Sequence, residues 1–154
     1  DDRYRRGLYT TWRRSNPYPS MATFDAPNRE VCTIRRDRTN TPLQALVTLN
    51  DPVFVEAAQA LGRRALAQPG TLDDQLRYAV LVTLGRPANG KEVKLLAQLY
   101  HDTETHFAQN QEAAIQLATD PLGPLPDGVP PSAGAAWTAI GNVLLNLDEV
   151  FLKR

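Results

Sequence analysis

Apolar residues recur at helical spacing over most of the chain from residue 41 onward. Leu76, Ala79, Val80 and Thr83 follow one another at steps that place them on one face of an α-helix. Similar stripes occur in the segments on either side, as Phe54, Ala57, Ala58, Leu61 and Ala65, and as Val93, Leu96, Leu99, Tyr100 and Phe107. The pattern predicts an all-α fold, a compact bundle of about five to seven helices.

Capping residues mark where these helices begin. Thr41-Pro42-Leu43-Gln44 is a capping-box pattern with proline at the first helical position. Asp51 precedes Pro52 in the same way, so two helices are expected to meet at Asn50-Asp51. Further helix starts are expected at Thr71, at Asn89 or Gly90, and at Asn110.

Prolines predict two irregular segments within one domain spanning residues 1–154. Residues 1–40 form a long front segment rich in Arg and aromatic residues, in which Tyr4, Leu8 and Trp12 predict a short helix and two prolines exclude one at Ser15–Ser20. A helical core is expected over residues 41–119. Residues 120–131, with five prolines and two glycines, are expected to form an irregular loop open to disorder or cleavage.

Residues 132–154 are expected to form one C-terminal helix of about five turns. Trp137, Ile140, Leu147 and Phe151 would face inward, together with either Val143 or Leu144. Gly134 and Gly141 leave room for close packing against another helix.

Charge is balanced over the whole chain but uneven along it. There are 17 basic and 17 acidic residues, so the chain has no net positive charge that would indicate a nucleic acid partner. Residues 1–38 hold nine Arg against five acids, whereas the remainder holds eight bases against twelve acids. No apolar run is long enough to span a membrane.

The basic residues of the front segment lie among tyrosines and a tryptophan, a composition that binds anions or sugar rings. An anion-binding or partner-binding surface is therefore one interpretation, and the other is that Arg side chains cover aromatic surface and pair with the acidic helices. The candidate binding residues are Arg13, Arg14, Arg35, Arg36 and Arg38.

The sequence contains no pattern that assigns a catalytic, cofactor-binding or metal-binding residue. His101 and His106 are five residues apart and so lie on different helical faces, which predicts two exposed histidines. Cys32 is the one cysteine and is expected to be a small buried hydrophobe. Glycine-rich phosphate loops are missing. A hydrolase that uses Asp148 and Glu149 is disfavoured, because adjacent side chains on a helix point about 100° apart.

A second polar set interrupts the apolar run of the last helix. Asn142 and Asn146 are four residues apart and share a face. The prediction is a buried hydrogen-bond network that ties the last helix to the Arg-rich loop, and the alternative is a binding site. The residues of the predicted network are Asn40, Asn142, Asn146, Asp148 and Glu149.

Three long strings carry a family resemblance. They are residues 6–14 (RGLYTTWRR), residues 20–33 (SMATFDAPNREVCT) and residues 38–46 (RTNTPLQAL), the last followed by residues 49–52 (LNDP). The tail adds residues 136–138 (AWT) and 142–149 (NVLLNLDE). These strings resemble the Planctomycete- and Verrucomicrobia-type C-terminal domain of unknown function, the PSD family found in large exported cytochrome-c-like proteins.

The resemblance implies a C-terminal part of an extracytoplasmic, multi-domain protein that packs on upstream domains of the same polypeptide. The expected role is that of a non-catalytic helical module that binds a partner domain or an anionic polymer such as a glycan. The alternative is an accessory domain of a cytochrome-c-type haem oxidoreductase. Any haem would belong to an upstream domain, since the haem attachment motif does not occur in this sequence.

Overall fold

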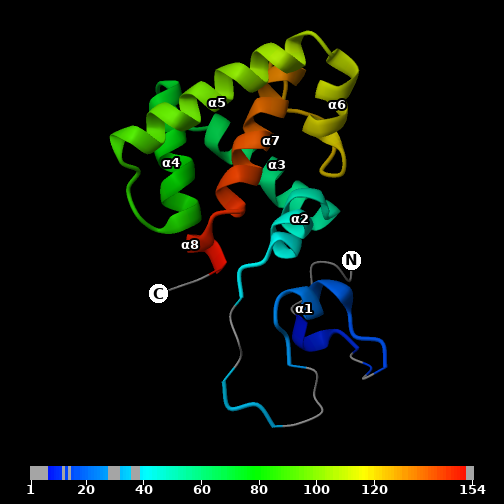
Figure 1. Ribbon diagram of the computed structural model, residues 1–154. Coiled ribbons are helices and arrows are strands. Elements are labelled where there is room, and N and C mark those ends of the chain that lie inside the picture. Colours follow the sequence, from blue (N-terminus) through cyan, green and yellow to red (C-terminus); the bar gives the residue numbers. More distant parts are fainter. Residues whose placement is uncertain (1–6, 12, 14, 28–31, 36–38, 152–154) are drawn as a thin grey trace. The chain divides into compact units, whose positions relative to one another are not determined.

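The computed structural model describes residues 7–11, 13, 15–27, 32–35 and 39–151 (Figure 1). All regular secondary structure in these residues is helical, which confirms the all-α fold. The sequence predicted one domain, and the chain falls into two compact units, unit 1 (Asp1–Val47) and unit 2 (Thr48–Arg154). The boundary lies seven residues beyond the predicted end of the front segment.

Unit 2 is built around helix α7 (Pro131–Leu145), which packs against α3, α5 and α6 (Figure 1). The other helices of unit 2 are α3 (Pro52–Leu66), α4 (Leu72–Leu84), α5 (Gly90–Ala108), α6 (Gln111–Thr119) and the short α8 (Asp148–Phe151). Trp137, Ile140 and Leu144 of α7 are buried with Leu76 and Val80 of α4 in the main core. The structure thus selects Leu144 over Val143 as the inward residue.

Glycines allow α3 and α7 to approach closely. A Cβ on Gly62 of α3 would lie 2.9 Å from backbone and side-chain atoms of Trp137. A Cβ on Gly141 of α7 would lie 2.9 Å from the Ala58 Cα and would overlap the Ala58 carbonyl oxygen. Such contacts are shorter than real Cβ atoms make, so both positions need glycine. The predicted close packing at Gly141 is confirmed.

Side chains cap α3, α4, α5 and α6 as predicted from the sequence. Asp51 accepts a hydrogen bond from Val53 N at 2.9 Å and begins α3. Thr71 and Asp74 form a capping box at α4, and Asn89 forms another at α5. Asn110 accepts from Ala113 N at 3.2 Å and begins α6. These local interactions satisfy backbone N–H groups that have no partner within the helix.

The loop between α6 and α7 is irregular, as predicted, but its first part is held by two side chains of α3. Gln59, 1% exposed, donates to the carbonyl oxygens of Leu117 and Asp120, both at 2.7 Å, and accepts from Leu122 N at 3.0 Å. Arg63 donates to the carbonyl oxygens of Ala118 and Gly123. Helix α3 therefore fixes the path by which the chain leaves α6.

Unit 1 contains a 3₁₀ turn at Gly7–Tyr9, the short helix α1 (Pro19–Thr23) and most of α2 (Pro42–Asn50), which extends into unit 2. Helix α1 corrects the expectation that the prolines near residue 19 exclude a helix, because Pro19 takes the first helical position and needs no N–H donor there. Leu8, 79% exposed, lies in the 3₁₀ turn rather than on a buried helical stripe. Tyr4 and Trp12 lie outside the described residues.

Two further expectations were wrong. The last helix is not continuous to Phe151, because α7 ends at Leu145 and Asn146 takes the capping position before α8. Cys32 is exposed rather than buried. Its neighbours Thr33 and Ile34 are also exposed, and no apolar surface covers this stretch of the described residues.

Candidate functional site

Helix α2 buries two polar side chains, Gln44 and Thr48, and exposes its leucines. Gln44 and Thr48, four residues apart on one face, are 5% and 1% exposed. Leu43 is 57% exposed and Leu46 is 58% exposed. A helix of a globular protein normally turns its apolar face toward the core, so the polarity of α2 is reversed. This exposed face of α2, made of Leu43, Leu46 and Leu49, is called the leucine face below.

Gln44 anchors α2 within unit 1 through both ends of its amide. Its nitrogen donates to the Thr23 carbonyl oxygen at 2.8 Å and to the Thr39 hydroxyl at 3.0 Å. Its oxygen accepts from Thr41 N at 3.0 Å, and the Thr41 hydroxyl accepts from Gln44 N at 3.3 Å. The predicted capping box is therefore present, and Gln44 additionally ties α2 to the end of α1 and to Thr39.

Asp25 completes the same polar cluster. Its carboxylate accepts from Thr39 N at 2.8 Å and from the Thr39 hydroxyl at 2.9 Å. The backbone of Asp25 has a φ of 57°, a left-handed conformation that residues other than glycine adopt at some cost. Among the described residues of unit 1, Gln44 is the one with a buried side chain. A polar cluster, rather than an apolar core, holds this unit together.

Thr48 anchors the other end of α2 within unit 2. Its hydroxyl donates to Asn146 Oδ1 at 2.8 Å, across 98 positions in sequence. Asn146 is also the capping residue that follows the end of α7 at Leu145. The two buried polar residues of α2 are thus satisfied by partners, and they fix which face of the helix points outward.

The structure places two of the five predicted binding arginines. Arg13 and Arg35 are exposed, in a unit where Tyr9 and Tyr18 are also exposed, at 69% and 51%. Arg14, Arg36 and Arg38 lie outside the described residues. The anion-binding or partner-binding surface stays a prediction.

Three of the five residues of the predicted buried polar network are not buried. Asn40, Asp148 and Glu149 are exposed, which contradicts their predicted burial. The reason for the last two is that α7 ends at Leu145, so both residues belong to the separate turn α8 at the surface. Asn146 is partly buried and bonds to Thr48, whereas Asn142 is partly buried with an Oδ1 that accepts no hydrogen bond among the described residues.

Glu149 instead belongs to an ion-pair network with the turn between α4 and α5. Arg86 donates to Glu149 at 2.7 Å and 2.8 Å and to Glu92 at 2.8 Å and 3.1 Å. The hydrogen bonds from Arg86 are the largest cause of the lowered pKa of Glu149. They also lower the pKa of Glu92 to about 2, with help from the backbone of Asn89. The network joins α8 to the start of α5.

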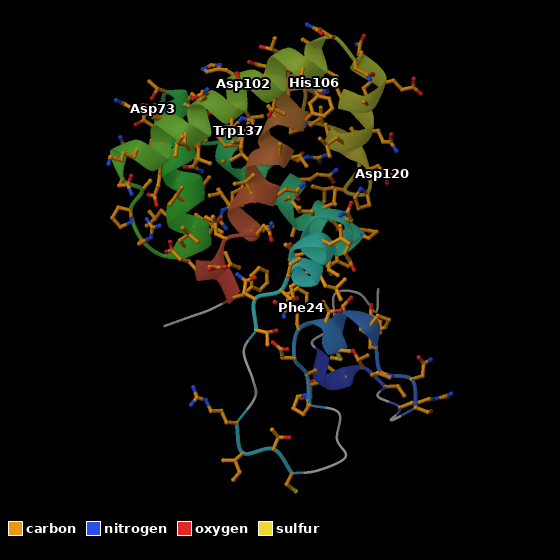
Figure 2. The ribbon with its side chains drawn as sticks, in the orientation of Figure 1. Phe24, Asp73, Asp102, His106, Asp120 and Trp137 are labelled. Carbon is orange, nitrogen blue, oxygen red and sulfur yellow. The ribbon has the colours of Figure 1, made fainter. Side chains whose placement is uncertain are left out.

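The described residues offer no constellation for metal binding. They contain no group of three or more His, Cys, Asp or Glu side chains close enough to hold an ion. His101 and His106 are exposed as predicted, and Figure 2 shows His106 with Asp102 on the outer side of α5. In the same part of the chain, no helix combines the length and the apolar character that a membrane span requires.

The sequence patterns did not predict the polar residues that hold the loop after α6 or those that orient α2. Gln59 and Arg63 lie on α3 beside its apolar stripe. A polar Gln next to Ala58 was a signal that this side of α3 bonds to backbone carbonyl groups as well as packing on apolar side chains. The reversed polarity of α2 was also missed. Its signal was present in the spacing of Gln44 and Thr48, which share a face that excludes the leucines.

No curated protein and no solved structure matches the chain. Residues 1–100 match a family described as PSD1, protein of unknown function (DUF1553). The match spans more than half of the 154 residues and includes unit 1, α2, α3, α4 and part of α5. It agrees with the resemblance carried by the strings of the front segment. The chain therefore belongs to the PSD1 family of proteins of unknown function.

Proposed function

We propose that the chain is a non-catalytic helical docking module of a larger exported protein, and that the leucine face of α2 packs on another domain of that polypeptide. The observation that carries the proposal is the reversed polarity of α2. Gln44 and Thr48 are held inward by hydrogen bonds, and the leucines on the opposite face are exposed to solvent.

The energy available from covering the face is substantial. Full burial of one leucine side chain is worth about 1.5–3 kcal/mol. Leu43, Leu46 and Leu49 are each roughly half exposed, so their cover would contribute a few kcal/mol, on the order of 2–4 kcal/mol in total. Turning the leucines inward by rotating α2 about its axis would break the hydrogen bonds of Gln44 and Thr48.

The character of the face favours a protein partner over a polysaccharide. Residues 42–50 carry no charge, and the outward side chains are aliphatic rather than aromatic. Aliphatic side chains gain most from contact with other apolar side chains, whereas sugars are bound mainly by aromatic stacking and polar groups. An apolar patch on a neighbouring domain is therefore the partner of matching chemistry.

Cysteine labelling tests the proposal in the protein as it exists. Cys32, which is exposed, is first replaced in the background variant Cys32→Ser. Leu46→Cys is then introduced into the chain alone and into the longer polypeptide with its preceding domains. We expect rapid reaction with a soluble thiol reagent in the chain alone and a strong loss of reactivity in the longer polypeptide.

Leu95→Cys is the matched control, because Leu95 is 68% exposed and belongs to a different helix, α5. It should react equally in both proteins. Equal reactivity of Leu46→Cys in the chain alone and in the longer polypeptide would sink the docking proposal.

The exposed arginines of unit 1 support a second candidate, the binding of an anionic polymer. Arg13 and Arg35 lie in a unit with exposed Tyr9 and Tyr18. Retention on a sulfated polysaccharide column should fall in an Arg13→Ala, Arg35→Ala variant and persist in an Arg77→Ala control, whose exposed side chain lies on α4. Unchanged retention in the double variant would exclude this candidate.

The role of an accessory domain in a cytochrome-c-type haem oxidoreductase is tested separately. Turnover of artificial electron donors by the longer polypeptide is compared with and without residues 1–154. An unchanged rate would argue against that role and would leave docking through the leucine face unaffected.

A further inference from the structure

The sequence contains two dipeptides in which Asn or Asp is followed by glycine, Asn89-Gly90 and Asp127-Gly128. In such pairs the backbone nitrogen of the glycine attacks the side-chain carbon and closes a five-membered succinimide ring. Glycine permits this because it has no side chain to obstruct the attack. In an unfolded chain, Asn-Gly reacts faster than Asp-Gly, since ammonia is lost from the amide more readily than water is lost from the acid.

The fold protects the faster pair. Asn89 is the capping residue of α5, and its Oδ1 accepts hydrogen bonds from Lys91 N at 3.0 Å and Glu92 N at 2.9 Å. Its backbone N–H donates to Glu92 at 2.8 Å, and Glu92 is in turn held by Arg86. Attack by the Gly90 nitrogen would require the Asn89 side chain to give up both capping bonds, so the helix start suppresses the reaction.

The slower pair has no such protection. Asp127 and Gly128 are both exposed, and the Asp127 carboxylate makes no hydrogen bond with any described residue. They form the centre of a turn closed by a hydrogen bond from Val129 N to the Pro126 carbonyl oxygen at 3.2 Å. Gly128 has a φ of 83°, and no atom lies within 4 Å of the position a Cβ would take. The Asp127 side chain is therefore exposed to solvent beside a glycine that has open space around it.

We propose that Asp127 is a site of spontaneous isoaspartate formation in the folded protein, and that the fold reverses the order of reactivity expected from the sequence. The Gly128 nitrogen bonds to Asp127 Cγ and loses its proton, and one side-chain oxygen leaves as water. A water molecule then adds to the ring. Opening at one carbonyl restores aspartate, and opening at the other gives isoaspartate, with no net change in mass or oxidation state.

The modification falls where it changes the path of the chain. Isoaspartate routes the backbone through the side-chain carbon and so lengthens the turn that is closed by the Val129–Pro126 hydrogen bond. On one side, Leu125 packs against Gly134 of α7, and on the other, Pro130 precedes α7 directly. The inserted atom must be accommodated between these two fixed points, so the Val129 amide is expected to lose its protection from hydrogen exchange.

The test compares ageing of the folded chain with ageing of the chain unfolded in urea. Isoaspartate is detected by methyl transfer from an isoaspartyl methyltransferase, followed by peptide mapping. In the folded chain we expect methyl acceptance at residue 127 and an unmodified Asn89. In urea we expect Asn89 to become the main site of modification.

Asp127→Glu is the matched variant, because its longer side chain forms the corresponding ring poorly and residue 127 is exposed. It should lose the methyl acceptance of the folded chain while keeping the same helical circular dichroism. The proposal is overturned if residue 127 is modified only in urea, or if Asn89 is the main site in the folded chain.

Discussion

Gly141 of α7 lies directly against the backbone of Ala58 of α3, so a methyl group at residue 141 would overlap the Ala58 carbonyl oxygen. Backbone at this contact cannot move aside as a flexible side chain could, and both helices are anchored in the core. The contact sets how closely the two helices that organise unit 2 can approach.

Gly141→Ala is therefore expected to destabilise unit 2. Overpacking typically costs about 1–3 kcal/mol, and the upper end applies here because the clash is with backbone. Urea unfolding monitored by circular dichroism measures the loss in the free energy of unfolding. Gly90→Ala is the matched control, since a Cβ there meets no atom within 4 Å. An equal effect of both substitutions would contradict the packing argument.

Gln59→Leu should release the loop between α6 and α7. The variant leaves the carbonyl oxygens of Leu117 and Asp120 and the N–H of Leu122 without their partner. Buried groups that lose a partner cost about 1–3 kcal/mol each, so we expect a loss of roughly 3 kcal/mol after partial rearrangement. The measurement is urea unfolding, together with faster hydrogen exchange at Leu122.

Gln98→Leu is the control for that variant, because Gln98 is exposed on α5. It should leave both the unfolding free energy and the exchange rate at Leu122 nearly unchanged. If Gln59→Leu were as mild as Gln98→Leu, the loop would be held by other contacts, such as those of Arg63.

Gln44→Met should loosen unit 1 without weakening unit 2. Methionine has a similar length but cannot bond to Thr23, Thr39 and Thr41, so the polar cluster loses its central member. Limited proteolysis should cut residues 15–41 faster, while the thermal transition of unit 2 stays in place. Leu43→Met, at the exposed neighbouring position, should change neither property.

Glu149→Gln should reduce stability at neutral pH, and the difference from the natural chain should disappear in acid. The folded-state pKa of Glu149 is lowered by Arg86, so its ionised form is favoured in the folded chain. A lowered pKa contributes stability above the unfolded value of about 4.3 and loses it as pH falls through the folded value. The difference in the free energy of unfolding between the two proteins is measured by urea unfolding at a series of pH values from neutral to strongly acidic.

Glu92 belongs to the same network, and its pKa in the folded chain is lowered to about 2. The stability that ionised Glu92 contributes should therefore be lost as the pH falls from about 4.3 to about 2. Asp102→Asn, on the outer side of α5 and outside the network, serves as the control (Figure 2). A difference between Glu149→Gln and the natural chain that grows toward acid would have the wrong sign for this linkage.

Features set by neighbours in sequence were predictable, and features set by distant partners were not. The starts of α3, α4, α5 and α6 depend on capping residues within three positions, so the pattern of Asp51, Thr71, Asn89 and Asn110 was sufficient. The end of α7 at Leu145 was not predicted. Nothing local stops the apolar periodicity there, and Asn146 bonds to Thr48, 98 positions away.

The candidate site shows the same division. The capping box of Thr41 and Gln44 was visible in the sequence, but the two additional hydrogen bonds of Gln44 depend on Thr23 and Thr39, which no periodicity connects to it. Apolar periodicity also led to the assumption that leucines face inward. In α2 that assumption was wrong, because buried hydrogen bonds of polar residues determine the orientation of the helix.

The polar character of unit 1 has a consequence for calorimetry. The heat capacity change of unfolding comes mainly from newly hydrated apolar surface, and the described residues of unit 1 bury no apolar side chain fully. Their melting should therefore add little to the heat absorbed, and a scanning calorimeter would record the transition of unit 2 almost alone. A thermogram with one sharp peak would be compatible with a front segment that has already lost its order.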